Sequence, residues 1–237
     1  MIKVEFKHKN KIQREALEWI EKYNPKYLND LDQKIDYYDF LFNYLPEAVN
    51  NIPGEESLSV SYFDKPMIED GNRIAGYTTQ NEVKIDSTLF NSDIDTEYRM
   101  TNWAIVHESY HAIFHRQLLR AKTQQQELFS IGVDSNKLDR IVTLHRDVGI
   151  DKSMKTPAEC IQANIFAGYF MIPKQRLKIA LQKVSNNEEI FVPKGFQKES
   201  WIDLLLADLI PYFDVNKMPL KIAINSYGFF EEKNALM

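Results

Sequence analysis

The segment that most constrains the fold is residues 103–115, where three histidines and a glutamate lie within an otherwise apolar helical pattern. The apolar side chains recur at the three- and four-residue spacings of a buried helix. They are Trp103, Val106, Tyr110, Ile113 and Phe114. Because unpaired polar groups are costly in apolar surroundings, the histidines and the glutamate need partners from elsewhere in the fold.

Within this segment, residues 107–111 have the form H-E-x-x-H. Residues four apart lie on one helix face, so His107 and His111 can bind one metal ion. Glu108 lies about 100° around the helix from His107, where its carboxylate can take a proton from a water on the metal. The motif predicts one Zn²⁺ per chain, ligands His107 and His111, and Glu108 as general base. The alternative is a surface helix whose His and Glu side chains are simply solvated.

A catalytic zinc site usually has three protein ligands, so a second segment must supply the third. We expect a helix over 156–170, which opens at Thr156-Pro157 and carries an apolar stripe that includes Ala163. Cys160 and Glu159 stand three and four residues before Ala163, so either can face the first helix. Either side chain can bind zinc, and Cys160 can also be a small buried residue with no ligand role.

The sequence supports a role in the metal site less strongly for the remaining candidate residues. His115 continues the stripe of His107 and His111 but lies more than about 10 Å from His107 along the helix axis. We therefore expect it to support a ligand or to pack in the core. His145 falls in a polar segment, 124–146, that we expect to be helical and exposed. Tyr110 and Tyr169 are expected in the core, with donation to an oxyanion as the alternative.

The rest of the chain predicts an α+β fold that is mainly helical. Two helical runs are expected between residues 11 and 46, the second ending at Pro46. Period-two alternation over 58–63, 73–78 and 82–86 predicts a small antiparallel sheet of about three strands beside the H-E-x-x-H helix, with a hairpin turn at 79–81. A helix near 201–212 and one more short helix are expected to follow. We divide the chain into an N-terminal helical segment (1–50), a core (51–185) and a C-terminal helical extension (186–237).

Composition narrows the functional classes. The chain has 237 residues, of which 44% are apolar, enough for one sizeable core or two small ones. A net charge of −5 disfavours broad nucleic-acid binding, which leaves only a local basic patch at 174–178. The apolar runs are too short to span a membrane, and the N-terminus lacks the pattern of a signal peptide. With a single cysteine the chain forms no internal disulfide, so a cytoplasmic location is expected.

The order of the motifs resembles that of the ImmA/IrrE metallopeptidases over roughly residues 70–228. The matching residues are Gly76-Tyr77, the H-E-x-x-H-x-x-x-H run of 107–115, Ala163-Asn164-Ile165-Phe166-Ala167 and Met171-Ile172-Pro173. The resemblance implies a zincin-like fold and zinc-dependent limited cleavage of a protein. In that family the substrate is often a helix-turn-helix repressor. This sequence contains no convincing helix-turn-helix, so such a repressor would be a separate protein.

Two residues depart from the family pattern. The family's third ligand is a Glu at the position of Cys160, and Glu159 lies one residue earlier. In the register of related zinc peptidases, Cys160 is then the ligand, and Asn164, four residues later, holds a zinc-bound His. His115 falls where the family often has a further His. Tyr110 replaces a small residue, so its ring must repack its surroundings or enter the cleft.

Other readings of the motif remain open. The exchange at Cys160 is compatible with a catalytically inactive module that acts by binding a partner, although the intact Glu108 argues for an enzyme. A toxin-like or host-directed protease would use the same chemistry. For a peptidase we expect the strand at 82–86 to border the cleft and to offer its edge to an extended peptide.

Overall fold

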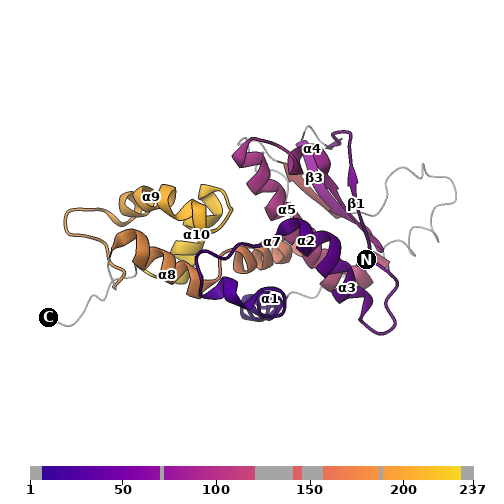
Figure 1. The fold of residues 1–237 in the computed structure, drawn as a ribbon, viewed down its shortest axis with the longest axis horizontal. Coiled ribbons are helices and arrows are strands. Elements are labelled where there is room, and N and C mark those ends of the chain that lie inside the picture. The colour runs from indigo at the N-terminus through magenta and orange to yellow at the C-terminus, as the bar shows by residue number, and fades with distance from the viewer. Residues whose placement is uncertain (1–6, 70–71, 121–140, 146–156, 187–188, 231–237) are drawn as a thin grey trace. The chain divides into compact units, whose positions relative to one another are not determined.

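The computed structural model describes residues 7–69, 72–120, 141–145, 157–186 and 189–230 (Figure 1). They form two compact units, which we describe separately. The first unit contains the described residues up to Gln13 and Asp36–Ala167, and the second contains Arg14–Ile35 and the described residues from Gly168 onward. These boundaries differ from those of the three segments expected from the sequence. The prediction of a mainly helical α+β chain is confirmed.

The helices of the described residues differ in length and include 3₁₀ and π turns. The longer helices are α1 (Lys9–Tyr23), α5 (Asp95–Phe114), α7 (Ala158–Met171), α8 (Lys174–Ser185), α9 (Lys198–Leu209) and α10 (Lys217–Tyr227). The shorter ones are α2 (Tyr37–Asp39), α3 (Leu45–Asn50) and α4 (Ser87–Phe90), with η1 (Pro25–Leu28), the π turn η2 (Phe40–Tyr44) and η3 (Ile210–Tyr212). None of the described helices is long and apolar enough to cross a membrane.

The sheet of the first unit is mixed. The three predicted strands correspond to β1 (Ser59–Phe63), β3 (Asn72–Thr78) and β4 (Glu82–Asp86), and β2 (Ile68–Glu69) and β5 (Ile141–His145) extend the sheet. The order is β1-β4-β3-β2, with β5 also paired to β3. Strand β1 runs parallel to β4, and the other pairs are antiparallel. The prediction of an antiparallel sheet is therefore wrong, because a parallel pair arises from long-range pairing that local alternation does not reveal.

Strand β4 lies between β1 and β3, so both of its edges are already hydrogen-bonded. The expectation that β4 offers a free edge to a peptide is wrong for this reason.

Two predictions of helices are also wrong. The second N-terminal run continues past Pro46 to Asn50, because proline is tolerated in the first turn of α3. In the segment 124–146, the described residues Ile141–His145 form a strand, and the rest lies outside the described residues.

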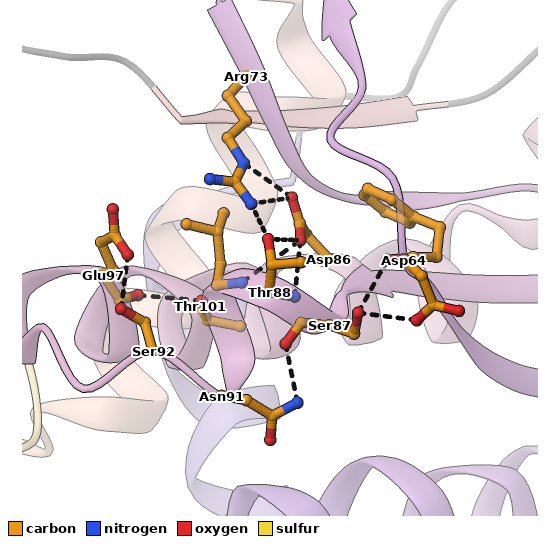
Figure 2. A network of polar contacts seen from close by, with 11 residues as sticks. Asp64, Arg73, Asp86, Ser87, Thr88, Asn91, Ser92, Glu97 and Thr101 are labelled. Carbon is orange, nitrogen blue, oxygen red and sulfur yellow. Dashed lines mark hydrogen bonds and ion pairs between the residues drawn. The ribbon is translucent and has the colours of Figure 1, made fainter.

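Asp86, which joins the end of β4 to α4, belongs to a network of polar contacts (Figure 2). Its side chain is fully buried. Its Oδ1 accepts hydrogen bonds from the backbone N–H of Thr88 at 2.9 Å and of Leu89 at 3.3 Å, which caps the helix. Its Oδ2 accepts from Arg73 Nε of β3 at 2.8 Å. The buried carboxylate is thus neutralised and fully bonded, and it fixes how the chain leaves the sheet towards α5.

Helix α5 packs on β3 and β4, and small side chains let it approach closely. Ala75, Leu89 and Ala104 form one buried cluster between the helix and the sheet. Beyond the end of α5, the buried Arg116 donates to the carbonyl of Gln80 at 2.8 Å and to Asn81 Oδ1 at 2.9 Å. The β3–β4 turn is therefore held against the end of the helix that carries the H-E-x-x-H motif.

In the second unit, a buried arginine organises the loops. The Arg176 guanidinium on α8 lies 3.9 Å from the Tyr27 ring centroid. It donates to five backbone carbonyls, those of Tyr27, Asp30, Leu31, Gln33 and Tyr212. The segment that follows η1 and the turn at η3 are thereby joined to α8 through one side chain.

Replacing Arg176 by Met should destabilise the protein by roughly 3 kcal/mol or more, because five backbone carbonyls lose a buried charged donor. The urea midpoint of unfolding measures the change. The matched control is Arg14→Met, which removes an exposed arginine of α1 and should shift stability by less than about 0.5 kcal/mol. An equal shift for both variants would contradict the role assigned to Arg176.

Candidate metal centre

The H-E-x-x-H motif lies in the C-terminal half of α5 and is buried against the sheet. His107 is 2% exposed, and Glu108 and His111 are fully buried. The two Nε2 atoms of His107 and His111 lie 3.1 Å apart. Helix α7 brings the half-buried Cys160 to the same place, so that the ligand atoms of His107, His111 and Cys160 all lie within 4.8 Å of one another. This cluster can hold a metal ion.

The chemistry of the three donors and the spacing of the two imidazole nitrogens fit a tetrahedral site. Bonds of 2.0–2.1 Å from one zinc ion to two imidazoles place the nitrogens about 3.3 Å apart, close to the observed separation of the Nε2 atoms. Two imidazoles and a thiolate are donors that zinc accepts. Among the described residues, Glu159 is not part of the cluster.

Asn164 sets the tautomer of His107. Its Oδ1 accepts a hydrogen bond from the indole N–H of Trp103 at 3.2 Å and lies 3.0 Å from His107 Nδ1. An indole nitrogen only donates, so the Asn164 atom between the two rings is the amide oxygen. His107 Nδ1 therefore carries the hydrogen, and the lone pair of Nε2 faces His111 and Cys160.

Burial keeps His107 neutral. Desolvation lowers the pKa of His107 from its ordinary 6.5 to about 4, although the hydrogen bond to Asn164 acts in the opposite direction. The neutral imidazole is the form that binds metals. The surroundings of His107 thus favour its ligand form at physiological pH.

His115 follows directly after α5 and supports His111. The two Nδ1 atoms lie 2.8 Å apart, and His115 is 4% exposed. With its Nδ1 engaged by His115, His111 presents Nε2 to His107 and Cys160. His115 is absent from the group of possible metal ligands among the described residues.

Thr78 holds the carboxylate of Glu108, a role that the sequence analysis missed. Its hydroxyl donates to Glu108 Oε2 at 2.6 Å. On the same face of β3, two residues earlier, a Cβ on Gly76 would lie 3.3 Å from Glu108 Cγ and 2.7 Å from Ile85 Cδ1. Gly76 therefore leaves room for Glu108 between helix and sheet. The signal available in the sequence was the Gly-x-Thr alternation of β3.

The other candidate side chains take structural positions. The Tyr110 ring is buried, with centroids 4.7 Å from Phe114 and 4.9 Å from Phe166, so it packs in the core. Tyr169 belongs to the second unit, where its ring lies 5.9 Å from that of Tyr227. His145 lies at the end of β5, and its side chain is outside the description.

Comparisons with known proteins do not identify a family. No family model, no curated protein and no solved structure matches the chain.

The third ligand can be tested by metal analysis. The purified protein, supplied with zinc, should hold about one ion per chain, and Cys160→Ala should lose it while Glu159→Ala retains it. Inductively coupled plasma mass spectrometry measures the content. Retention in Cys160→Ala with loss in Glu159→Ala would mean that α7 presents the other face to the histidines.

The role of Asn164 can be tested through metal affinity. Asn164→Leu removes the acceptor for His107 and should weaken zinc binding by about 10- to 100-fold. Asn164→Asp keeps an acceptor oxygen in the same place and should bind zinc about as tightly as the unsubstituted protein does. Competition with a fluorescent zinc chelator measures both, and equal affinities for the two variants would contradict the role.

Proposed function

We propose that this protein is a zinc-dependent metallo-endopeptidase of zincin-like fold that cleaves another protein in the cytoplasm. The observation that carries the proposal is a buried carboxylate, Glu108, next to the His107, His111 and Cys160 cluster. A metal site with a purely structural role needs no such base. The resemblance of the motif order to the ImmA/IrrE metallopeptidases supports the same function.

The residues divide the work between binding and proton transfer. His107, His111 and Cys160 would hold the zinc ion, which when bound polarises a peptide carbonyl and acidifies a water. Glu108 takes the proton of the attacking water and delivers it to the leaving amine. Thr78, bonded to Glu108 Oε2 at 2.6 Å, fixes the direction of that carboxylate. Because Glu108 is fully buried, bulk solvent does not compete for its carboxylate.

The substrate class follows from the resemblance. A regulatory protein such as a helix-turn-helix repressor, cut once or a few times, is the expected substrate. It would be a separate chain.

A second candidate function rests on Cys160. The ImmA/IrrE metallopeptidases have a Glu ligand at this position, whereas this chain has the thiol of Cys160. The replacement of Glu by Cys is compatible with a zinc-binding regulatory module that has lost catalysis. Glu108 and its bond to Thr78 favour the enzyme, because a module without catalysis has no use for an oriented base.

Glu108→Gln separates the two functions, because it removes the base and leaves the metal ligands intact. A cell extract treated with the zinc-loaded protein should gain new protein N-termini, and Glu108→Gln should lower their yield at least about a hundredfold with an unchanged zinc content. Labelling of N-termini and mass spectrometry measure the yield. Glu18→Gln, on the exposed face of α1, is the matched control and should cleave normally.

Equal cleavage by the wild-type protein and Glu108→Gln would exclude Glu108 as the base. No cleavage by either zinc-loaded protein, when the extract contains the proteins encoded beside it, would favour the regulatory module.

A further inference from the structure

The second unit contains a hollow of about 870 Å³ that is separate from the residues of the metal centre. It is bordered by α8, the segment 189–197, the start of α9 and the residues around the end of α10. Its volume lies in the range of pockets that bind small molecules or a few residues of a peptide. The residues that decide its chemistry are Lys174, Lys178, Lys194, Lys198, Phe191 and Phe196.

The charge of the hollow is positive. Four lysines line it against one acidic residue, Glu189. Lys174 and Lys178 stand four apart on one face of α8. Within the described parts of the chain, the recorded ion pairs involve none of the four lysines. In a chain of net charge −5 this local excess is distinctive, and an anionic ligand would relieve the repulsion among the lysines.

The hollow is also apolar. Phe191 and Phe196 are 51% and 47% exposed, which is unusual for large aromatic side chains. The Lys174 ammonium lies 5.9 Å and 5.8 Å from the ring centroids of Tyr227 and Phe229, so charge and aromatic surface are interleaved. A matching ligand therefore carries apolar side groups beside its negative charges.

The backbone of this segment favours a peptide as the ligand. Residues 189–192 belong to no helix or strand and form no backbone–backbone hydrogen bond with other described residues. Their N–H and C=O groups can pair with an extended peptide, whereas an acyl chain has no such groups to offer. Peptide binding uses the charge, the aromatic side chains and the main-chain groups of residues 189–192 together.

We propose that this hollow docks an acidic peptide segment that also carries aromatic or aliphatic side chains, and that the segment belongs to the protein substrate. The identity of the partner as substrate rests on the proposed endopeptidase function. The docking itself does not, because it uses none of the metal-centre residues.

Fluorescence anisotropy tests the docking with the full-length protein and a short fluorescein-labelled peptide of Asp, Glu, Phe and Leu. Lys178→Glu and Phe191→Ala should each weaken binding at least about fivefold, and added salt should weaken it further. The matched controls Lys217→Glu and Leu204→Ala alter an exposed lysine and an exposed leucine outside the hollow and should change affinity less than about twofold. A peptide with Lys in place of Asp and Glu should not bind.

Equal losses in the hollow variants and in the controls would overturn the proposal, as would no binding of the acidic peptide. If single-stranded DNA or dodecanoate bound the hollow more tightly than the acidic peptide and displaced it, the assignment of a peptide ligand would be overturned. Glu108→Gln should bind the peptide normally. Peptide binding without any cleavage would contradict the endopeptidase alone, and Glu108-dependent cleavage without peptide binding would contradict the docking site alone.

Discussion

The close packing of α5 on β3 is the contact on which the candidate metal centre depends. It buries Glu108 completely, and a buried carboxylate requires a hydrogen-bond donor, which Thr78 supplies at 2.6 Å. The approach is possible because Gly76 has no Cβ at the point where the Glu108 side chain packs against β3. The same contact that forms the core of the first unit thus orients the side chain to which we assign proton transfer.

A second constraint is that the ring nitrogens of the buried histidines need hydrogen-bond partners. His107 and His111 each use one ring nitrogen for a protein partner, Asn164 and His115 respectively, and the other nitrogens face one another. This arrangement needs α7 as well as α5, because Asn164 and Cys160 are on α7 and stand one helical turn apart. One helix therefore contributes both a candidate ligand and the residue that orients another ligand.

Two buried charges, Asp86 and Arg176, are compensated in different ways. In the first unit, Asp86 is neutralised by Arg73 and capped by backbone N–H groups. In the second, Arg176 donates to backbone carbonyl oxygens and lies over the rings of Tyr27 and Phe213, so its charge is spread over many partners. The four lysines of the hollow form no ion pair with other described residues, which sets them apart as a surface suited to an anionic partner.

The sequence by itself determined the parts of the site that depend on local geometry. The helical repeat places His107 and His111 on one face with Glu108 beside them, and this holds wherever the helix packs. The three strands were also predictable, because their sequences alternate between apolar and polar residues. Tertiary structure decided the rest. Whether Cys160 or Glu159 faces the histidines depends on the rotation of α7 against α5. The support of Glu108 by Thr78, the parallel pairing of β1 and the strand at 141–145 arise from contacts between distant segments, which no local pattern encodes.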